Sequence, residues 1–138
     1  MGHRFRDRDR LLRALTHASW AHEHPPTVHN EALAFVGDAA LGLVVAERLF
    51  LEDPAAPVGR LTARRAEIVS GASLARWAAA LELGGLLRLG RGEAGSGGAA
   101  RPSTLAEALE AVLGAVYLDG GLPALRAVVG RLADGAPW

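Results

Sequence analysis

Residues 30 to about 50 are apolar on nearly every side of the helix that their spacing predicts. Such a helix has no polar face to turn toward water, so other elements must cover it and it must lie at the centre of the fold. Asn30 suits the N-cap, because a short polar side chain there accepts a hydrogen bond from the first turn. We therefore expect a central, buried helix that begins after Asn30.

Further helices are predicted on both sides of this segment. The first covers residues 8–20 and turns Leu11, Leu12 and Leu15 inward. Residues 90–101 are rich in glycine and are expected to form a flexible connector. No stretch alternates polar and apolar residues as a strand does, so the predicted fold class is all-α. The later helices are expected at 61–69, 72–81, about 104–118 and 123–132.

The composition suits one helical domain, residues 1–138, in the cytoplasm. Half of the residues are hydrophobic but only three Trp, three Phe and one Tyr are present, so the core consists of Ala, Leu and Val, which suit closely packed helices. Cysteine is absent, which excludes disulfides and thiolate metal sites and fits a reducing compartment. Glu47 and Arg48 interrupt the longest apolar run, so we expect no membrane partner.

The charge is balanced overall but uneven along the chain. Fifteen basic residues, all of them arginine, face fifteen acidic ones, so no overall basic field attracts nucleic acid. The arginines are nevertheless clustered at residues 4–13, 60–65 and 88–101. Local basic surfaces are therefore still expected.

Two pairs of carboxylates interrupt the apolar helices. Glu31 and Asp38 are seven residues apart, with Ala34 between them, and so share one helix face; Glu107 and Glu110 share a face of the later helix. Buried carboxylates are costly unless they are paired, hydrogen-bonded or bound to a metal. Oxygen ligands without cysteine suit Mg²⁺ or Mn²⁺ rather than Zn²⁺. Carboxylates that hold such ions activate water and offset charge in phosphodiester cleavage, so the pattern predicts a divalent-metal site between packed helices.

Each acid also has a simpler structural explanation. Glu31 lies in a first helical turn, where a carboxylate favours the helix dipole. Thr104 and Glu107 have the spacing of a capping box, in which Glu107 would bond the helix start. Asp38 and Glu110 are harder to explain in this way, because both lie among apolar residues inside helices. These two are the strongest candidates for a functional role.

Residues 30–41, NEALAFVGDAAL, resemble the signature of the ribonuclease III family, usually written N-E-x-L-E-F-L-G-D-x-x-L. Four other segments are similar to further motifs of that family in the same order. The similarity extends over about residues 2–132 with little gapping. These segments are 15–19, 59–71, 87–98 and 105–119.

The resemblance implies a helical nuclease domain that forms a homodimer and holds double-stranded RNA in a valley. The implied reaction is Mg²⁺-dependent hydrolysis of one phosphodiester per strand, with Mn²⁺ as a possible substitute. Asp38 and Glu110 match the principal acidic ligands, Glu107 matches a further acidic position, and Glu31 matches the first acid of the signature. Phe35 matches the aromatic residue that inserts into the partner subunit.

Three positions depart from the family pattern. Ala34 stands where the signature has its second Glu, a metal ligand; Glu107 replaces an Asp, and Val58 replaces an acid that some members have. Loss of a ligand carboxylate weakens metal affinity. Glu107 is one methylene longer than Asp and is a candidate to reach into the gap. The chain also leaves no room for the double-stranded-RNA-binding domain that usually follows in the family.

These features favour a divergent endoribonuclease of reduced activity that acts on double-stranded or structured RNA. The alternative is a catalytically inactive member of the fold that binds RNA or serves as an assembly scaffold, which the loss at Ala34 supports. A metal-dependent enzyme with another phosphate substrate has only the oxygen ligands in its favour. Four retained acids favour the nuclease. With no net charge, we expect weak, shape-driven binding to duplex RNA.

Overall fold

The computed structural model describes residues 1–134, and apart from an isolated parallel bridge between Thr16 and Arg88 its regular structure there is helical. The prediction of an all-α fold is confirmed. The helices are α1 (Arg8–Ala14), α2 (Ala18–Glu23), α3 (Glu31–Glu52), α4 (Val58–Ile68), α5 (Gly71–Ala80), α6 (Arg91–Gly95) and α7 (Pro102–Ala133), with short 3₁₀ turns η1 (Leu83–Leu86) and η2 (Gly98–Ala100).

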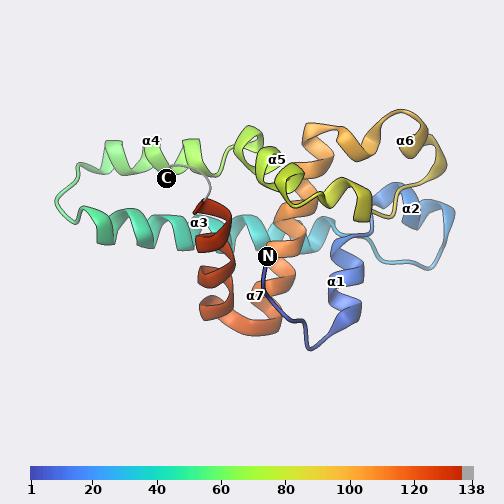
Figure 1. Ribbon diagram of the computed structural model, residues 1–138, viewed down its shortest axis with the longest axis horizontal. Coiled ribbons are helices and arrows are strands. Elements are labelled where there is room, and N and C mark those ends of the chain that lie inside the picture. Colours follow the sequence, from blue (N-terminus) through green and yellow to red (C-terminus); the bar gives the residue numbers. More distant parts are fainter. Residues whose placement is uncertain (135–138) are drawn as a thin grey trace.

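The two longest helices, α3 and α7, cross at the centre of the molecule (Figure 1). At the crossing, each helix has a glycine where no side chain would fit. A β-carbon on Gly37 would overlap the carbonyl oxygen of Glu110, and a β-carbon on Gly114 would overlap that of Leu33. The two glycines therefore let the backbones touch. Fully buried side chains surround the crossing, among them Leu41, Val45, Leu109, Leu113 and Val116.

Helix α7 consists of two helical parts joined by a sharp bend. Gly121 has φ +72°, a left-handed conformation that glycine adopts without a steric penalty, and Pro123 opens the second part. The predicted break after residue 118 is thus confirmed. By length and composition α7 could cross a membrane, but it is a core helix here, because Val112 and Val116 are at most 1% exposed.

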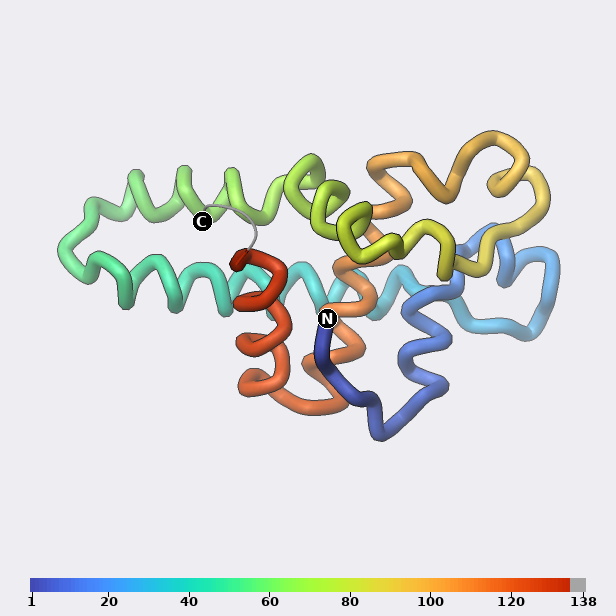
Figure 2. The backbone as a smooth tube through the Cα atoms, viewed as in Figure 1, coloured from blue at the N-terminus to red at the C-terminus, as the bar shows by residue number. Residues whose placement is uncertain are grey.

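Helix α3 is central, as predicted from the sequence. The further prediction that it is buried on all sides is wrong. One face packs against α7, while α4 runs beside only the C-terminal half of α3 and forms a projecting arm with it (Figure 2). On the remaining face Phe35 is 80% exposed, and Leu43 and Phe50 are more than half exposed. No other element packs over these three side chains within the described part of the chain.

The predicted helix over residues 8–20 is wrong, because the chain leaves the helical path after α1. The amide of His17 donates to the carbonyl oxygen of Arg88 at 3.0 Å, and the amide of Arg88 donates to that of Leu15 at 2.8 Å. The carbonyl of Leu15 and the amide of His17, which a continuing helix would use, are thus bonded to a distant part of the chain instead. Leu12, which was expected to face inward, is 46% exposed.

The glycine-rich segment 90–101 is also ordered rather than a plain connector. It contains α6 and η2, and its start is tied to α2: the amide of Arg91 donates to the carboxylate of Glu23 at 2.9 Å. An ion pair between Glu93 and Arg101 closes the segment. Because Arg101 directly precedes α7, this segment sets where that helix begins.

Asn30 occupies the predicted N-cap position but makes no capping bond with its side chain. Its side-chain amide instead donates to the carbonyl oxygen of Ala14 at 3.2 Å, and its backbone amide donates to that of Thr16 at 2.9 Å. Asn30 is 2% exposed. It therefore fastens the beginning of α3 to the end of α1.

Candidate functional site

Four acidic side chains from two helices line one hollow of about 510 Å³ between α3, α5 and α7. Glu31 and Asp38 come from α3, and Glu107 and Glu110 come from α7. The tertiary structure thus brings together both pairs of acids that the sequence singled out. We call this hollow the carboxylate hollow.

The helix crossing explains why the two pairs meet. Gly37 touches the backbone of α7 at Glu110, so the next residue, Asp38, lies beside that turn of α7. The sequence suggested that Asp38 is buried, but it is exposed, because it lies at the edge of the crossing and faces the hollow. Glu107 and Glu110 are only partly exposed.

Glu110 lies near two other carboxylates, those of Asp38 and Glu107. Desolvation by burial, followed by the nearby charges of Asp38 and Glu107, raises the pKa of the Glu110 carboxyl from 4.5 to about 7. Each added carboxylate makes it harder to ionise the next. The site therefore has a deficit of positive charge that either a proton or a cation can relieve.

The donor chemistry fits a hard divalent cation, since the hollow offers only carboxylate oxygens and no thiol. Within residues 1–134, however, no three His, Asp or Glu side chains are close enough together to ligate one ion. A ligand set would require the side chains of Asp38, Glu107 and Glu110 to rotate toward one another. Glutamate has enough rotatable bonds for this.

Ala34 lines the same hollow and is 6% exposed. It lies one helical turn before Asp38 and one turn after Glu31, and its methyl group faces the hollow where a longer side chain would offer a ligand. The α3 side of the hollow therefore has a gap between its two acids.

The capping explanation for Glu107 is wrong. Helix α7 already begins at Pro102, Arg101 occupies the N-cap position, and no side chain caps the helix. Thr104 lies inside the helix and is buried. Glu107 is thus not needed to start α7.

Glu31 keeps its simpler explanation, because it lies in the first turn of α3. One of its carboxylate oxygens is also 3.8 Å from Nδ1 of His29. The two side chains form an ion pair when the imidazole ring is protonated. Of the four acids, Glu31 has the most local reasons for its position.

Sequence reasoning missed the other residues that form the hollow. Ser103 and Ala106 each lie four positions before an acid of α7, so helical spacing could have identified them. Val69, Gly71 and Leu74 come from α5 and the turn before it, and no local pattern links them to the acids. Phe35, singled out for another reason, also lines the hollow, so its exposed ring lies beside the carboxylates.

A family model described as Ribonuclease-III-like matches residues 7–134. Ribonuclease 3 of Caldanaerobacter subterraneus subsp. tengcongensis is 52% identical over 130 residues, which is 94% of this chain and 57% of that protein. Ribonuclease 3 of Nitratidesulfovibrio vulgaris is 51% identical over 133 residues, which is 96% of this chain and 53% of that protein. This chain therefore spans little more than half the length of these curated relatives.

A solved structure with the same fold is the nuclease domain of ribonuclease III from Campylobacter jejuni. It superposes with a TM-score of 0.91 at 36% identity, covering 99% of this chain and 93% of that one. That structure is described as showing flexibility in a region involved in dimer formation.

Proposed function

This chain belongs to the ribonuclease-III-like family, and we propose that it is a divergent, Mg²⁺-dependent endoribonuclease. Its substrate is double-stranded or structured RNA. The observation that carries the proposal is the carboxylate hollow, where acids from α3 and α7 meet at the helix crossing.

Within this proposal, Asp38, Glu107 and Glu110 hold the metal, and Mn²⁺ can replace Mg²⁺. A divalent ion bound there would supply an activated water and offset the charge that develops on the phosphate. The raised pKa of Glu110 supports this assignment, because a cation would relieve the repulsion among the three carboxylates. Glu31 contributes negative charge at the edge of the hollow.

We propose that activity is reduced because Ala34 leaves the α3 side of the hollow one carboxylate short. Fewer anionic ligands bind a divalent ion less tightly and hold its water less firmly. Glu107 compensates in part, since its side chain is long enough to lean toward the gap.

The proposal includes a homodimer formed through α3. Phe35, Leu43 and Phe50 expose apolar surface on one face of this helix, and contiguous apolar patches on soluble proteins mark interaction sites. A second copy of the chain would cover this face. The related Campylobacter jejuni domain has a region involved in dimer formation. Because Phe35 also lines the carboxylate hollow, dimerisation would place the partner subunit next to the site.

The second candidate function is an inactive RNA-binding or assembly protein. Ala34 is the observation that favours it, since a ligand position has become a buried methyl group. Family membership does not decide between the two, because a fold persists after its chemistry is lost.

One cleavage experiment distinguishes these functions. A long labelled RNA duplex is incubated with the chain in Mg²⁺ and then Mn²⁺, beside the variants Glu110→Gln and Ala34→Glu. We expect slow cleavage that Glu110→Gln abolishes and Ala34→Glu accelerates. Cleavage by Ala34→Glu alone would mean that the site is intact but disabled at position 34. If all three proteins are inactive while still folded, the binding or assembly function is supported instead.

A further inference from the structure

The segment that leads into α1 lines a second hollow, which is basic and apolar where the carboxylate hollow is acidic. Its volume is about 520 Å³, and it shares no lining residue with the carboxylate hollow. Three exposed arginines form its charged part, and Phe5 and Leu11 form its apolar part. We call it the arginine hollow; its residues are His3, Arg4, Phe5, Arg6, Arg8 and Leu11.

Most arginines of the chain have a partner, but those in this hollow have none among the described residues 1–134. Arg60 and Arg64 of the basic helix α4, for example, pair with acids. Only five guanidinium groups make no hydrogen bond, ion pair or ring contact with the described residues 1–134. Three of those five lie together in the arginine hollow. The five are Arg4, Arg6, Arg8, Arg65 and Arg91.

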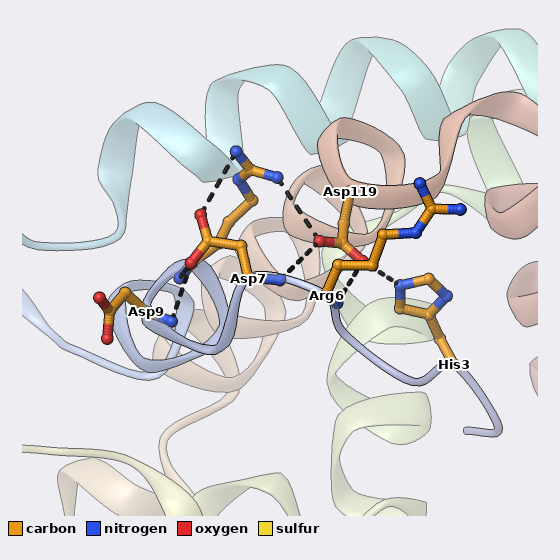
Figure 3. A network of polar contacts seen from close by, with 6 residues as sticks. His3, Arg6, Asp7, Asp9 and Asp119 are labelled. Carbon is orange, nitrogen blue, oxygen red and sulfur yellow. Dashed lines mark hydrogen bonds and ion pairs between the residues drawn. The ribbon is translucent and has the colours of Figure 1, made fainter.

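The backbone that carries these arginines is fixed in place by Asp119. The amides of Arg6 and Asp7 each donate to this carboxylate at 3.1 Å, and Nε2 of His3 lies 2.9 Å from it. Figure 3 shows the Arg6 backbone bound in this way while its guanidinium has no dashed contact. The Asp119 side chain is 2% exposed. The backbone of this segment is thus held by hydrogen bonds, while the guanidinium groups of Arg4, Arg6 and Arg8 have no partner in the part of the chain that the structure describes.

The three acids nearest to the arginine hollow, Asp7, Asp9 and Asp119, do not pair with its arginines. The carboxylate of Asp9, beside Arg8 in the chain, makes no ion pair with the described residues. The carboxylate of Asp119 accepts hydrogen bonds from the backbone amides of Arg6 and Asp7 and forms an ion pair with Arg10. The carboxylate of Asp7 caps α1 and lies 3.5 Å from Arg10. Three like charges on one short segment repel one another, and an anion with several charged oxygens removes that cost. Guanidinium groups suit this purpose, because their paired N–H donors match two oxygens of a phosphate.

We propose that the arginine hollow is a binding site for the phosphodiester backbone of RNA, at which Arg4, Arg6 and Arg8 contact neighbouring phosphates. The apolar floor of Phe5 and Leu11 accommodates the sugar edge of a nucleotide better than a hydrated small anion. The choice of RNA rests on the proposed function. Asp119 follows Glu110 by nine residues of α7, which is roughly 13 Å along the helix and about half a turn around it. Asp119 therefore projects from the opposite side of α7, and a duplex that reaches both hollows must extend well beyond the cleaved bond.

Salt dependence of RNA binding tests this site. A labelled RNA duplex is titrated by fluorescence anisotropy at several KCl concentrations with the Glu110→Gln chain, which cannot cleave it. The test variant adds Arg4→Gln, Arg6→Gln and Arg8→Gln. The matched control adds Arg65→Gln and Arg91→Gln, which remove the other two unpartnered guanidinium groups. None of these changes removes a hydrogen bond or ion pair within residues 1–134, so thermal unfolding should be nearly the same in all proteins.

The test variant should lower the slope of log K against log salt by about two to three, since each lost phosphate contact contributes about 0.9. The control should change it by clearly less for each arginine removed. An equal change for each arginine in both would indicate diffuse attraction and overturn the proposal. So would the absence of RNA binding, or inorganic triphosphate binding that depends on the three arginines while the RNA slope does not.

Cleavage by the unmodified chain is measured separately. If the chain does not cleave RNA but the slope falls as expected, the arginine hollow stands and the nuclease function fails. If the chain cleaves RNA and the slope is unchanged, the nuclease function stands and the arginine hollow fails.

Discussion

Gly37 of α3 lies directly against the carbonyl oxygen of Glu110 on α7, so the two helices touch backbone to backbone where their carboxylates meet. The glycine costs helix stability by itself. Here it is required, because a side chain at this position would push apart the helices that form the site. One contact thus serves both the core and the carboxylate hollow.

Replacing Gly37 with Ala should destabilise the protein by about 1–3 kcal/mol or more, as is usual when a packed contact is overfilled. The new methyl group would overlap backbone, which cannot rotate away. Urea unfolding measures the change. Gly42→Ala is the matched control on the same helix: a β-carbon there has nothing within 4 Å, so it should stabilise by about 0.5–1 kcal/mol. Equal effects at both positions would contradict the close crossing.

The raised pKa of Glu110 predicts a loss of stability with rising pH. The folded protein holds this proton up to about pH 7, whereas the unfolded chain releases it near 4.5. The stabilising effect is therefore complete below pH 4.5 and disappears as the pH rises to 7. In EDTA, Glu110→Gln should melt at an increasingly higher temperature than the parent over this range. Glu82→Gln, at an exposed acid, is the control; a flat difference for Glu110→Gln would contradict the pKa shift.

Asp119 predicts the opposite dependence at low pH. The amide of Arg6, followed by the amide of Asp7 and the side chain of His3, lowers the pKa of its carboxyl to about 2 despite its burial. Stability from this group is present above about pH 4 and disappears as the pH falls to 2. Asp119→Asn should therefore lower the melting temperature at pH 7 but not at pH 2.

Proteolysis offers a second measurement of the same link. Asp119→Asn should speed cleavage of the segment before α1. Asp9→Asn should not, because Asp9 joins the network of Figure 3 through its backbone amide alone, and its exposed carboxylate makes no contact there. Equal rates in both variants would mean that Asp119 does not hold this segment.

Phe35→Asp should prevent dimerisation of the chain. A large aromatic residue at the centre of an interface commonly contributes 2 kcal/mol or more to binding, and a charge at a ring position that is now 80% exposed would have to be desolvated on association. Sedimentation equilibrium measures the dissociation constant. Leu12→Asp places the same charge at an exposed apolar residue of α1, outside the α3 face. A dimer that survives Phe35→Asp would move the interface elsewhere.

Glu107→Asp should lower the cleavage rate further, even though it restores the family's usual residue. The shorter side chain cannot reach across the gap at Ala34, so it would supply one ligand oxygen fewer where one is already missing. Single-turnover cleavage in Mg²⁺ measures the effect, and the same substitution made together with Ala34→Glu should be harmless. Faster cleavage by Glu107→Asp alone would contradict the compensation.

The positions of the long helices and of the four acids follow from the sequence alone. Helical periodicity depends on neighbours within a few residues, and α3, α4, α5 and the bend in α7 lie close to the predicted boundaries for that reason. Faces also follow from spacing, so each pair of acids could be placed on one stripe before the helices were assembled. The resemblance of two separate segments to motifs of the ribonuclease III family predicted that Asp38 and Glu110 belong to one site.

Only the tertiary structure decided how these helices meet and where they stop. Helix α1 ends because residues 15–17 bond to Arg88, which is 72 residues away from Thr16. Asn30 bonds to α1 rather than to its own helix, and an apolar face of α3 is left exposed instead of covered. Such outcomes depend on partners distant in the chain, whose free energies compete with local preferences. Local pattern therefore determined which residues could act, and long-range contacts determined which of them lie together.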